Sequence, residues 1–279
     1  MAFDSHYRCD REFLKLLTRR ADVDLVGVAL EVARDAYPDL DAAAVRDWID
    51  ARVAEVRGPV ARAESEAEAL VELGRCIHET HGLTGGCAAF ETADGSYLHR
   101  VIETKTGIPI SLSILYMAVA ERVGLDLNGV AAPRHFLTRY ESADGPLFVD
   151  AYHGGRVLTL DECLRFLSAV TDLPGRRILP RLVPVDPRSI VVRMLNNLKA
   201  IYAKQGRWPS AWHVQHRLVA LQPAAYGERR DLALIALKAG RPGCAVDLLN
   251  SCLASGPEED RAELRSHLKT AQAQLCRLN

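Results

Sequence analysis

The sequence shows no excess of either charge and no long apolar run. Of its 279 residues, 35 are Lys or Arg and 36 are Asp or Glu, which leaves a formal net charge of −1. A clustered basic surface is not expected, and we expect no nucleic-acid partner. The most apolar run, Ile108 to Ala120, contains two serines and is too short to cross a bilayer. The N-terminus lacks a basic segment followed by an apolar one, so we expect neither a signal peptide nor a membrane partner.

The seven cysteines are odd in number and include no Cys-x-x-Cys pair. That absence excludes a zinc ribbon and a thioredoxin motif. Scattered thiols are typical of a reducing compartment, so we expect a cytoplasmic protein. The remaining composition, 48% hydrophobic and 25% charged, is that of a globular protein. No pattern indicates a cofactor, and we expect none.

Apolar periodicity and loop signals divide the chain into three predicted regions. Residues 1–81 are expected to form an N-terminal helical region, in which Gly58-Pro59 breaks one helix. Residues 82–185 are expected to form an α+β core that begins with a Gly-rich loop. Residues 186–279 are expected to be all-α.

The last of these regions contains an internal repeat. Four landmarks recur 34 residues apart, which is the period of the tetratricopeptide repeat. The pairs are Leu198 and Leu232, Gly206 and Gly240, Ala211 and Ala245, and Pro223 and Pro257. Each repeat is a helical hairpin that buries its apolar face only against a neighbour. We therefore predict two repeats and a capping helix over residues 258–275.

The central region contains one helix that is apolar on nearly every side and is therefore predicted to be buried. It begins at Pro109, where the missing N–H costs no hydrogen bond, and ends at Gly124. Three short strands are predicted to follow it, over residues 127–131, 135–140 and 146–150. A buried helix followed by an antiparallel meander is an α+β pattern.

Several motifs in this region together resemble the SirB-type transglutaminase-like family, whose members join such a core to tetratricopeptide repeats. The motifs are Ser96-Tyr97-Leu98, GIPISLS at residues 107–113, Pro133-Arg134-His135-Phe136-Leu137, and Asp150-Ala151-Tyr152-His153-Gly154-Gly155. The resemblance covers about residues 10 to 275 and implies a papain-like or transglutaminase-like fold more than a reaction. This chain departs from the family pattern at three places, where Gly85-Gly86, Gly95 and Arg134 stand for Gly-Asn, Asn and Gly.

Active relatives of this fold have a cysteine nucleophile at a helix start, followed by a histidine base and an aspartate that orients it. A helix start lowers the pKa of such a thiol and stabilises an oxyanion. Here His135 and Asp150 are present, but Gly107-Ile108-Pro109 occupies the nucleophile's place. The resemblance therefore implies a catalytic arrangement without its nucleophile.

Four interpretations of His135 and Asp150 stay open. The two side chains form a structural pair between adjacent strands, or they anchor a peptide or small ligand. Alternatively, Ser111 or Cys87 serves as an atypical nucleophile, or the pair binds a metal with His153. The candidate catalytic positions are His135, Asp150 and Ser111, and the candidate pocket adds Cys87, Tyr97, Gly107, Pro109, Ser113, Arg134 and His153.

The sequence favours a non-catalytic protein, a pseudoenzyme that binds a protein or peptide partner. The repeats offer a surface of the kind that holds peptides. The alternative is an amide-bond hydrolase or acyl transferase that uses His135 and Asp150 with an atypical nucleophile. The pattern does not decide between the two classes.

Overall fold

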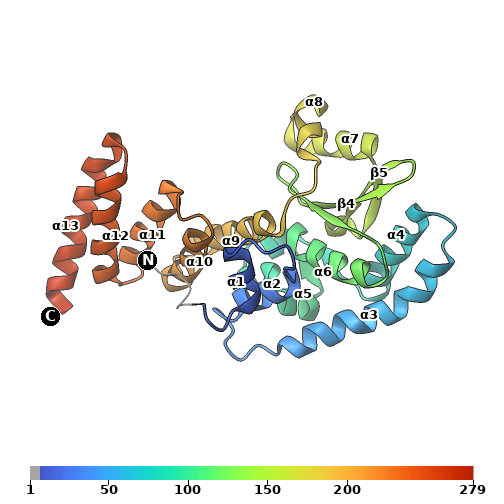
Figure 1. The fold of residues 1–279 in the computed structure, drawn as a ribbon, viewed down its shortest axis with the longest axis horizontal. Coiled ribbons are helices and arrows are strands. Elements are labelled where there is room, and N and C mark those ends of the chain that lie inside the picture. Colours follow the sequence, from blue (N-terminus) through green and yellow to red (C-terminus); the bar gives the residue numbers. More distant parts are fainter. Residues whose placement is uncertain (1–6, 279) are drawn as a thin grey trace. The chain divides into compact units, whose positions relative to one another are not determined.

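The computed structural model describes residues 7–278, and it divides into two compact units. One unit comprises Val23–Met194. The other combines the described part of Met1–Asp22 with that of Leu195–Asn279. The predicted α+β class is confirmed, since helices predominate and the strands are confined to Val23–Met194 (Figure 1). In the described part of the chain, no helix is both long and apolar enough to span a membrane.

The unit Val23–Met194 begins with helices that pack around one buried helix. These are α2 (Leu25–Ala33), α3 (Ala42–Arg62), α4 (Glu66–Gly74), the π-helix η2 (Arg75–Thr80) and, after the loop, α5 (Leu98–Thr104). The side chains of Asp41 and Ser65 cap α3 and α4 by accepting main-chain N–H bonds. The prediction that Gly58-Pro59 breaks a helix is wrong, because α3 continues to Arg62. A proline removes one intrahelical hydrogen bond near a helix end without preventing the next turn.

The Gly-rich loop contains only short elements: β1 (Thr84–Gly85), the 3-10 turns η3 (Cys87–Phe90) and η4 (Ala93–Ser96), and β2 (Thr106–Gly107). β1 and β2 pair in parallel, with Gly85 opposite Gly107. This pairing holds the loop against the start of α6 (Pro109–Arg122).

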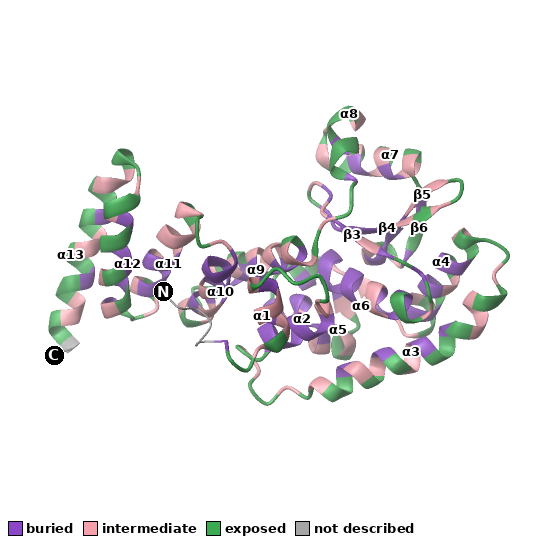
Figure 2. Ribbon diagram, viewed as in Figure 1, coloured by how far each residue is buried: buried purple, intermediate pink, exposed green. Residues whose placement is uncertain are grey.

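Helix α6 is the buried centre of this unit, as its sequence predicts. Most of its residues are buried, including its first two, Pro109 and Ile110, and Figure 2 shows much of it in the buried colour. Pro109 occupies the first turn, where the sequence places it. A helix without a solvated face requires neighbours on every side, and α2, α3 and α5 provide them together with the sheet.

A four-stranded antiparallel meander follows α6, in the order β3 (Asn128–Val130), β4 (Leu137–Ser142), β5 (Gly145–Asp150) and β6 (Arg156–Thr159). The predicted helix–meander pattern is confirmed, but β6 was not anticipated. Helix α6 contacts β3 and β4, whereas α7 (Leu160–Thr171) contacts β5 and β6, so the sheet lies between them (Figure 1). An apolar core joins the sheet to α7 and the short α8 (Gly175–Ile178).

The predicted repeats form successive helical hairpins. Their helices are α9 (Pro187–Lys204), α10 (Trp208–Leu221), α11 (Tyr226–Lys238), α12 (Pro242–Ser255) and α13 (Arg261–Leu278). The repeated glycines, Gly206 and Gly240, turn the chain with φ of 67° and 71°, a backbone conformation that glycine adopts readily. The repeated alanines, Ala211 and Ala245, are fully buried where the paired helices meet. The repeated glycines and alanines thus have the turning and packing roles that their positions in the repeat predict.

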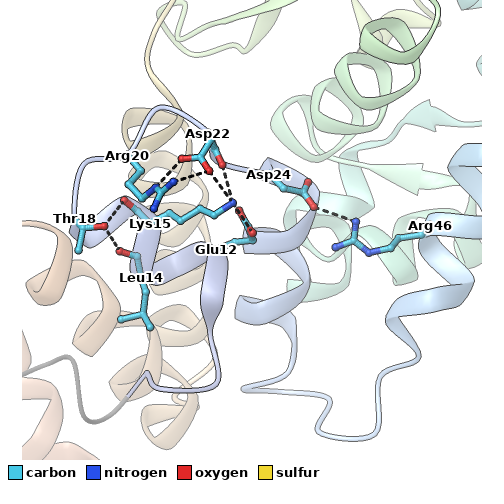
Figure 3. A network of polar contacts seen from close by, with 8 residues as sticks. All are labelled: Glu12, Leu14, Lys15, Thr18, Arg20, Asp22, Asp24 and Arg46. Carbon is cyan, nitrogen blue, oxygen red and sulfur yellow. Dashed lines mark hydrogen bonds and ion pairs between the residues drawn. The ribbon is translucent and has the colours of Figure 1, made fainter.

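The helix α1 (Arg11–Leu17) belongs to the same unit as the repeats. Figure 3 shows Lys15 between two carboxylates, with its Nζ 2.9 Å from Glu12 Oε1 and 3.4 Å from Asp22 Oδ2. Arg20 pairs with the same Asp22 carboxylate at 2.8 Å. These pairs lie at the surface and hold the turn after α1, and surface ion pairs of this kind contribute little to stability.

Candidate functional site

Asp150 lies at the centre of the candidate site and contacts two histidines. Its carboxylate is 1% exposed. Oδ1 lies 2.9 Å from His135 Nε2, and Oδ2 lies 2.7 Å from His153 Nδ1. The main-chain N–H of His153 also donates to Oδ1 at 3.3 Å. The structure therefore brings together three of the predicted residues as a carboxylate shared by two imidazoles.

The sheet and two sharp turns place these side chains. Asp150 ends β5, and the turn η5 (Ala151–His153) folds His153 back onto its carboxylate. Gly154 and Gly155 follow with φ of 75° and 76°, which explains the paired glycines of the motif. His135 was predicted to lie in a strand, but β4 begins only at Leu137. A turn closed by the bond from His135 N to Ala132 O holds the imidazole just before the strand.

Burial and the two histidines act in opposite directions on the pKa of Asp150. Burial is the largest single influence, and by itself it raises the pKa. The hydrogen bonds and charges of His135 and then of His153 together outweigh burial, so the pKa lies below its ordinary value of 3.8. Asp150 is therefore ionised at neutral pH and orients both rings.

Aromatic rings cover most of His135. Tyr152 and Phe166 approach it edge-on, with ring centroids 6.0 Å and 5.4 Å away. Arg193 donates to the main-chain oxygens of His135, at 2.6 Å, and Ala132. His135 is left only 7% exposed. Sequence reasoning did not assign Tyr152, Phe166 or Arg193 to the site. Tyr152 lies within the D-A-Y-H-G-G motif, but no local pattern marks the other two.

The two serines of α6 are both fully buried, and they differ in their hydrogen bonds. The Ser111 hydroxyl donates to main-chain oxygens, 2.6 Å from Gly95 O and 3.0 Å from Ile108 O. The Ser113 hydroxyl has no partner within residues 7–278. Neither serine is hydrogen-bonded to His135 there. A hydroxyl proton that is donated to a carbonyl is not available to an imidazole base.

Two other predicted pocket residues lie in different surroundings. Cys87 is exposed at the start of η3. Burial raises the pKa of the Tyr152 hydroxyl, and the neighbouring Cys87 raises it further, so this thiol adjoins the ring that covers His135. Tyr97 is buried and packs against Tyr37 and His99, at centroid distances of 5.5 Å and 6.1 Å. Tyr97 therefore faces other aromatic rings, and no contact joins it to His135 among the described residues.

The structure shows what surrounds each of the three positions at which the chain departs from the family pattern. A Cβ on Gly86, which stands for asparagine, would lie 2.8 Å from Thr106 Cγ2, and one on Gly95 would lie 2.3 Å from Ala89 O. Larger residues at these positions require the loop to move. Arg134, which stands for the usual glycine, has a φ of 56° and an exposed side chain. The position thus keeps the left-handed backbone that favours glycine.

A pocket of about 470 Å³ lies elsewhere in the same unit. The end of α2, the start of α3 and one side of α5 line it, and they include Tyr37, Asp39 and His99. Neither His135 nor Asp150 contributes to its lining. A ligand in this pocket would not touch the candidate triad residues directly.

The site also has the donor types of a metal centre. Ligand atoms of His135, Asp150 and His153 all lie within 4.8 Å of one another. Both oxygens of Asp150 already accept hydrogen bonds from the imidazoles. The same contacts are thus explained by a hydrogen-bonded triad without an ion.

Together the fold and the site define an α+β core of papain-like order, without a nucleophile at its helix start, joined to helical repeats. A profile of the Transglutaminase-like superfamily matches residues 43–196, and a Tetratricopeptide repeat profile matches residues 198–269. The chain belongs to the transglutaminase-like superfamily. The resemblance to SirB-type proteins is confirmed by relatives that match most of the chain.

A UPF0162 protein from Xylella fastidiosa (strain 9a5c) is 32% identical over 248 residues, which cover 88% of each chain. Protein SirB1 from Salmonella typhimurium is 23% identical over 231 residues, 81% of this chain and 84% of the relative. F-box only protein 21 from Homo sapiens is 28% identical over 152 residues, 51% of this chain and 23% of that protein. No solved structure matches the chain significantly. A transglutaminase-like domain joined to repeats suggests a role in protein interaction.

Proposed function

We propose that this chain is a non-catalytic protein- or peptide-binding protein of the cytoplasm. One observation carries the proposal: Pro109 occupies the nucleophile's position, and the nearby Ser111 hydroxyl donates to Gly95 O at 2.6 Å. Proline has no nucleophilic group, and the serine proton is already donated. The helix start that activates a thiol in relatives of this fold therefore has no group to activate.

The surroundings of His135 support a structural role for the pair. Its Nε2 faces Asp150, and the rings of Tyr152 and Phe166 cover most of its surface. An imidazole that acts as a general base must reach an atom of the substrate. A buried pair in which the carboxylate bonds an imidazole instead fixes the turn between β5 and η5.

The proposal is tested with the full-length chain on an immobilised array of unmodified peptides. We expect reversible capture of some peptides, no change of mass in peptide or protein, and binding by His135→Ala within about threefold of the parent. Arg134→Ala is the matched control, since it changes the exposed neighbour and leaves the imidazole in place. A covalent product that His135→Ala loses while still folded would contradict the proposal.

A second candidate function rests on Cys87. This thiol is exposed and adjoins Tyr152, whose ring lies 6.0 Å from His135. A shift of the η3 turn would bring it toward the imidazole and would yield a hydrolase or acyl transferase acting on amide bonds. In that case an electrophilic thiol probe labels Cys87 faster than the exposed Cys9, Cys244 and Cys276, and the excess disappears in His135→Ala. Equal labelling of these four thiols would remove this candidate.

A further inference from the structure

A second cluster of metal-binding side chains lies outside the candidate site, on α3 and η2. It comprises Glu55, Cys76 and His81, whose ligand atoms all lie within 4.8 Å of one another. His81 Nε2 is 2.5 Å from Glu55 Oε2, and Cys76 Sγ is 3.7 Å from the same oxygen. Three different donor types therefore converge on one point.

The π-helix is what brings the cysteine and the histidine together. Cys76 and His81 are five residues apart, and in an α-helix that spacing places side chains about 140° apart around the axis. Here the chain takes a π-turn over Arg75–Thr80, closed by the bond from His81 N to Cys76 O at 3.2 Å. The hydrogen bond of a π-turn spans five residues, so each turn is wider and the two side chains come close enough for their ligand atoms to lie within 4.8 Å. Such turns are rare and occur frequently at functional sites.

We propose that Glu55, Cys76 and His81 form a site for a divalent metal ion of the zinc class, with the fourth coordination position open to solvent or to a ligand. Thiolate, imidazole and carboxylate are the ligands that zinc takes in proteins, and three protein ligands with an open position are typical of its reactive sites. On binding, the Cys76 thiol loses its proton to solvent as the sulfur–metal bond forms.

The distances fit a tetrahedral ion after a small adjustment. Zinc–sulfur bonds of about 2.3 Å and zinc–nitrogen bonds of about 2.0 Å place neighbouring ligand atoms roughly 3.3–3.6 Å apart. The separation of Cys76 Sγ and Glu55 Oε2, 3.7 Å, is already close to that range. The separation of His81 and Glu55 must lengthen by about 1 Å, which rotation of an exposed glutamate side chain provides.

The residues around the cluster support the geometry of a metal site. Arg52 donates to Glu55 Oε1 at 2.8 Å, which leaves Oε2 for the ion. The Arg52 guanidinium also packs over the Trp48 ring, and the ring of Trp48 lies edge-on to His81 at 6.5 Å. Outer contacts of this kind orient metal ligands.

Access to the cluster is open from one side. The side chains of Glu55 and His81 are 43% and 24% exposed, whereas Cys76 is 9% exposed. An ion thus enters past the glutamate and meets the thiol at the base of the site. The cluster shares no residue with the group formed by His135, Asp150 and His153, so the two are tested separately.

Cobalt(II) distinguishes the two groups of side chains by absorption. A thiolate ligand gives a charge-transfer band, and the group formed by His135, Asp150 and His153 contains no sulfur. The full-length chain, kept reduced with a phosphine, is titrated with Co²⁺. We expect one equivalent to produce the thiolate band and Zn²⁺ to displace it. The band is expected to vanish in Cys76→Ser, and His81→Gln is expected to weaken cobalt affinity by more than about a hundredfold, beyond the loss typical of outer contacts.

Two controls keep the test decisive. Cys87→Ser and His153→Gln are expected to retain the band and its affinity, because neither residue belongs to the cluster. If Cys76→Ser does not fold, as judged by circular dichroism, Glu55→Gln replaces it, since that side chain is exposed and its loss is expected to weaken binding at least tenfold. Binding without a thiolate band, a band that survives Cys76→Ser, a cobalt affinity that Glu55→Gln leaves unchanged, or no binding at all would each overturn the proposal.

Discussion

Ser111 and Ser113 are two residues apart on α6, and both are fully buried. The Ser111 hydroxyl has two main-chain acceptors, whereas the Ser113 hydroxyl has none among the described residues. A satisfied buried hydroxyl stabilises the fold, but an unsatisfied one carries its desolvation cost without compensation. The same substitution is therefore expected to have opposite effects at the two positions.

We predict that Ser111→Ala lowers the free energy of unfolding by about 1–2 kcal/mol, and that Ser113→Ala leaves it unchanged or raises it by up to about 1 kcal/mol. Urea unfolding of both variants measures the difference, and each serves as the other's control. Equal destabilisation would mean that Ser113 has a partner, such as an ordered water. A large loss at Ser113 alone would show that its hydroxyl, not that of Ser111, holds the start of α6.

At the scale of the element, the Asp150 side chain joins the end of β5 to η5. This link depends on the negative charge of the carboxylate. Its pKa is lowered in the folded protein, so the native state binds fewer protons than the unfolded chain at acidic pH. Its contribution to stability is complete above the unfolded pKa near 3.8 and is lost as the pH falls through the folded value. Stability therefore falls with acidification in that window.

We predict that Asp150→Asn lowers the free energy of unfolding at pH 7 by about 3 kcal/mol, as expected when one partner of a buried charged group is removed. The difference from the parent protein is expected to shrink below about pH 4, because the carboxylate of the unfolded parent then takes up a proton and the folded one follows at lower pH. Denaturant unfolding between pH 3 and pH 7 measures both effects. A difference that stays constant over this range would show that the carboxylate's charge does not matter, and Glu141→Gln on β4 is the exposed control.

Local patterns decided which elements were predictable. The repeats were predictable because a 34-residue period fixes glycine turns and buried alanines in the sequence itself, as at Gly206 and Ala211. The buried α6 was predictable because its apolar residues cover every side. Strand β6 was missed because its exposed and buried residues follow no clear alternation over four positions. The π-turn at Cys76 was missed because a helical pattern does not reveal how many residues each turn contains.

In the candidate site too, contacts set by a local sequence pattern were predictable, and contacts set by packing of distant elements were not. The pairing of His135 with Asp150 was predictable from motif order, because two antiparallel strands bring their ends together. The partners from distant elements were not predictable, since Phe166 and Arg193 reach His135 only through the packing of α7 and α9. The second hydrogen bond of Asp150, to His153, depends on a turn whose geometry the two following glycines indicate but do not specify.

At the scale of the whole molecule, the described residues before Val23 belong to the unit that contains the repeats. Arg217 on α10 is 2% exposed and lies 2.7 Å from Asp10. The guanidinium also packs over the rings of Tyr7 and Phe13, 4.8 Å from each centroid. A buried arginine depends strongly on its carboxylate partner, because an uncompensated buried charge is costly. The first helix and the repeats are therefore expected to lose their structure together.

We predict that Asp10→Asn destabilises this unit by about 3 kcal/mol, as for other buried charge pairs. Hydrogen exchange is then expected to accelerate in α1 and across residues 195–279, and to stay unchanged in the strands of Val23–Met194. Lys15→Ala, which removes two surface ion pairs and one bond to the Asp22 main chain, is expected to change neither region. Faster exchange in α2, α3 and α4 instead would favour the alternative organisation that the sequence predicts, in which residues 1–81 form one helical region. The measurement thus decides whether α1 unfolds with the repeats or with the helices that follow it.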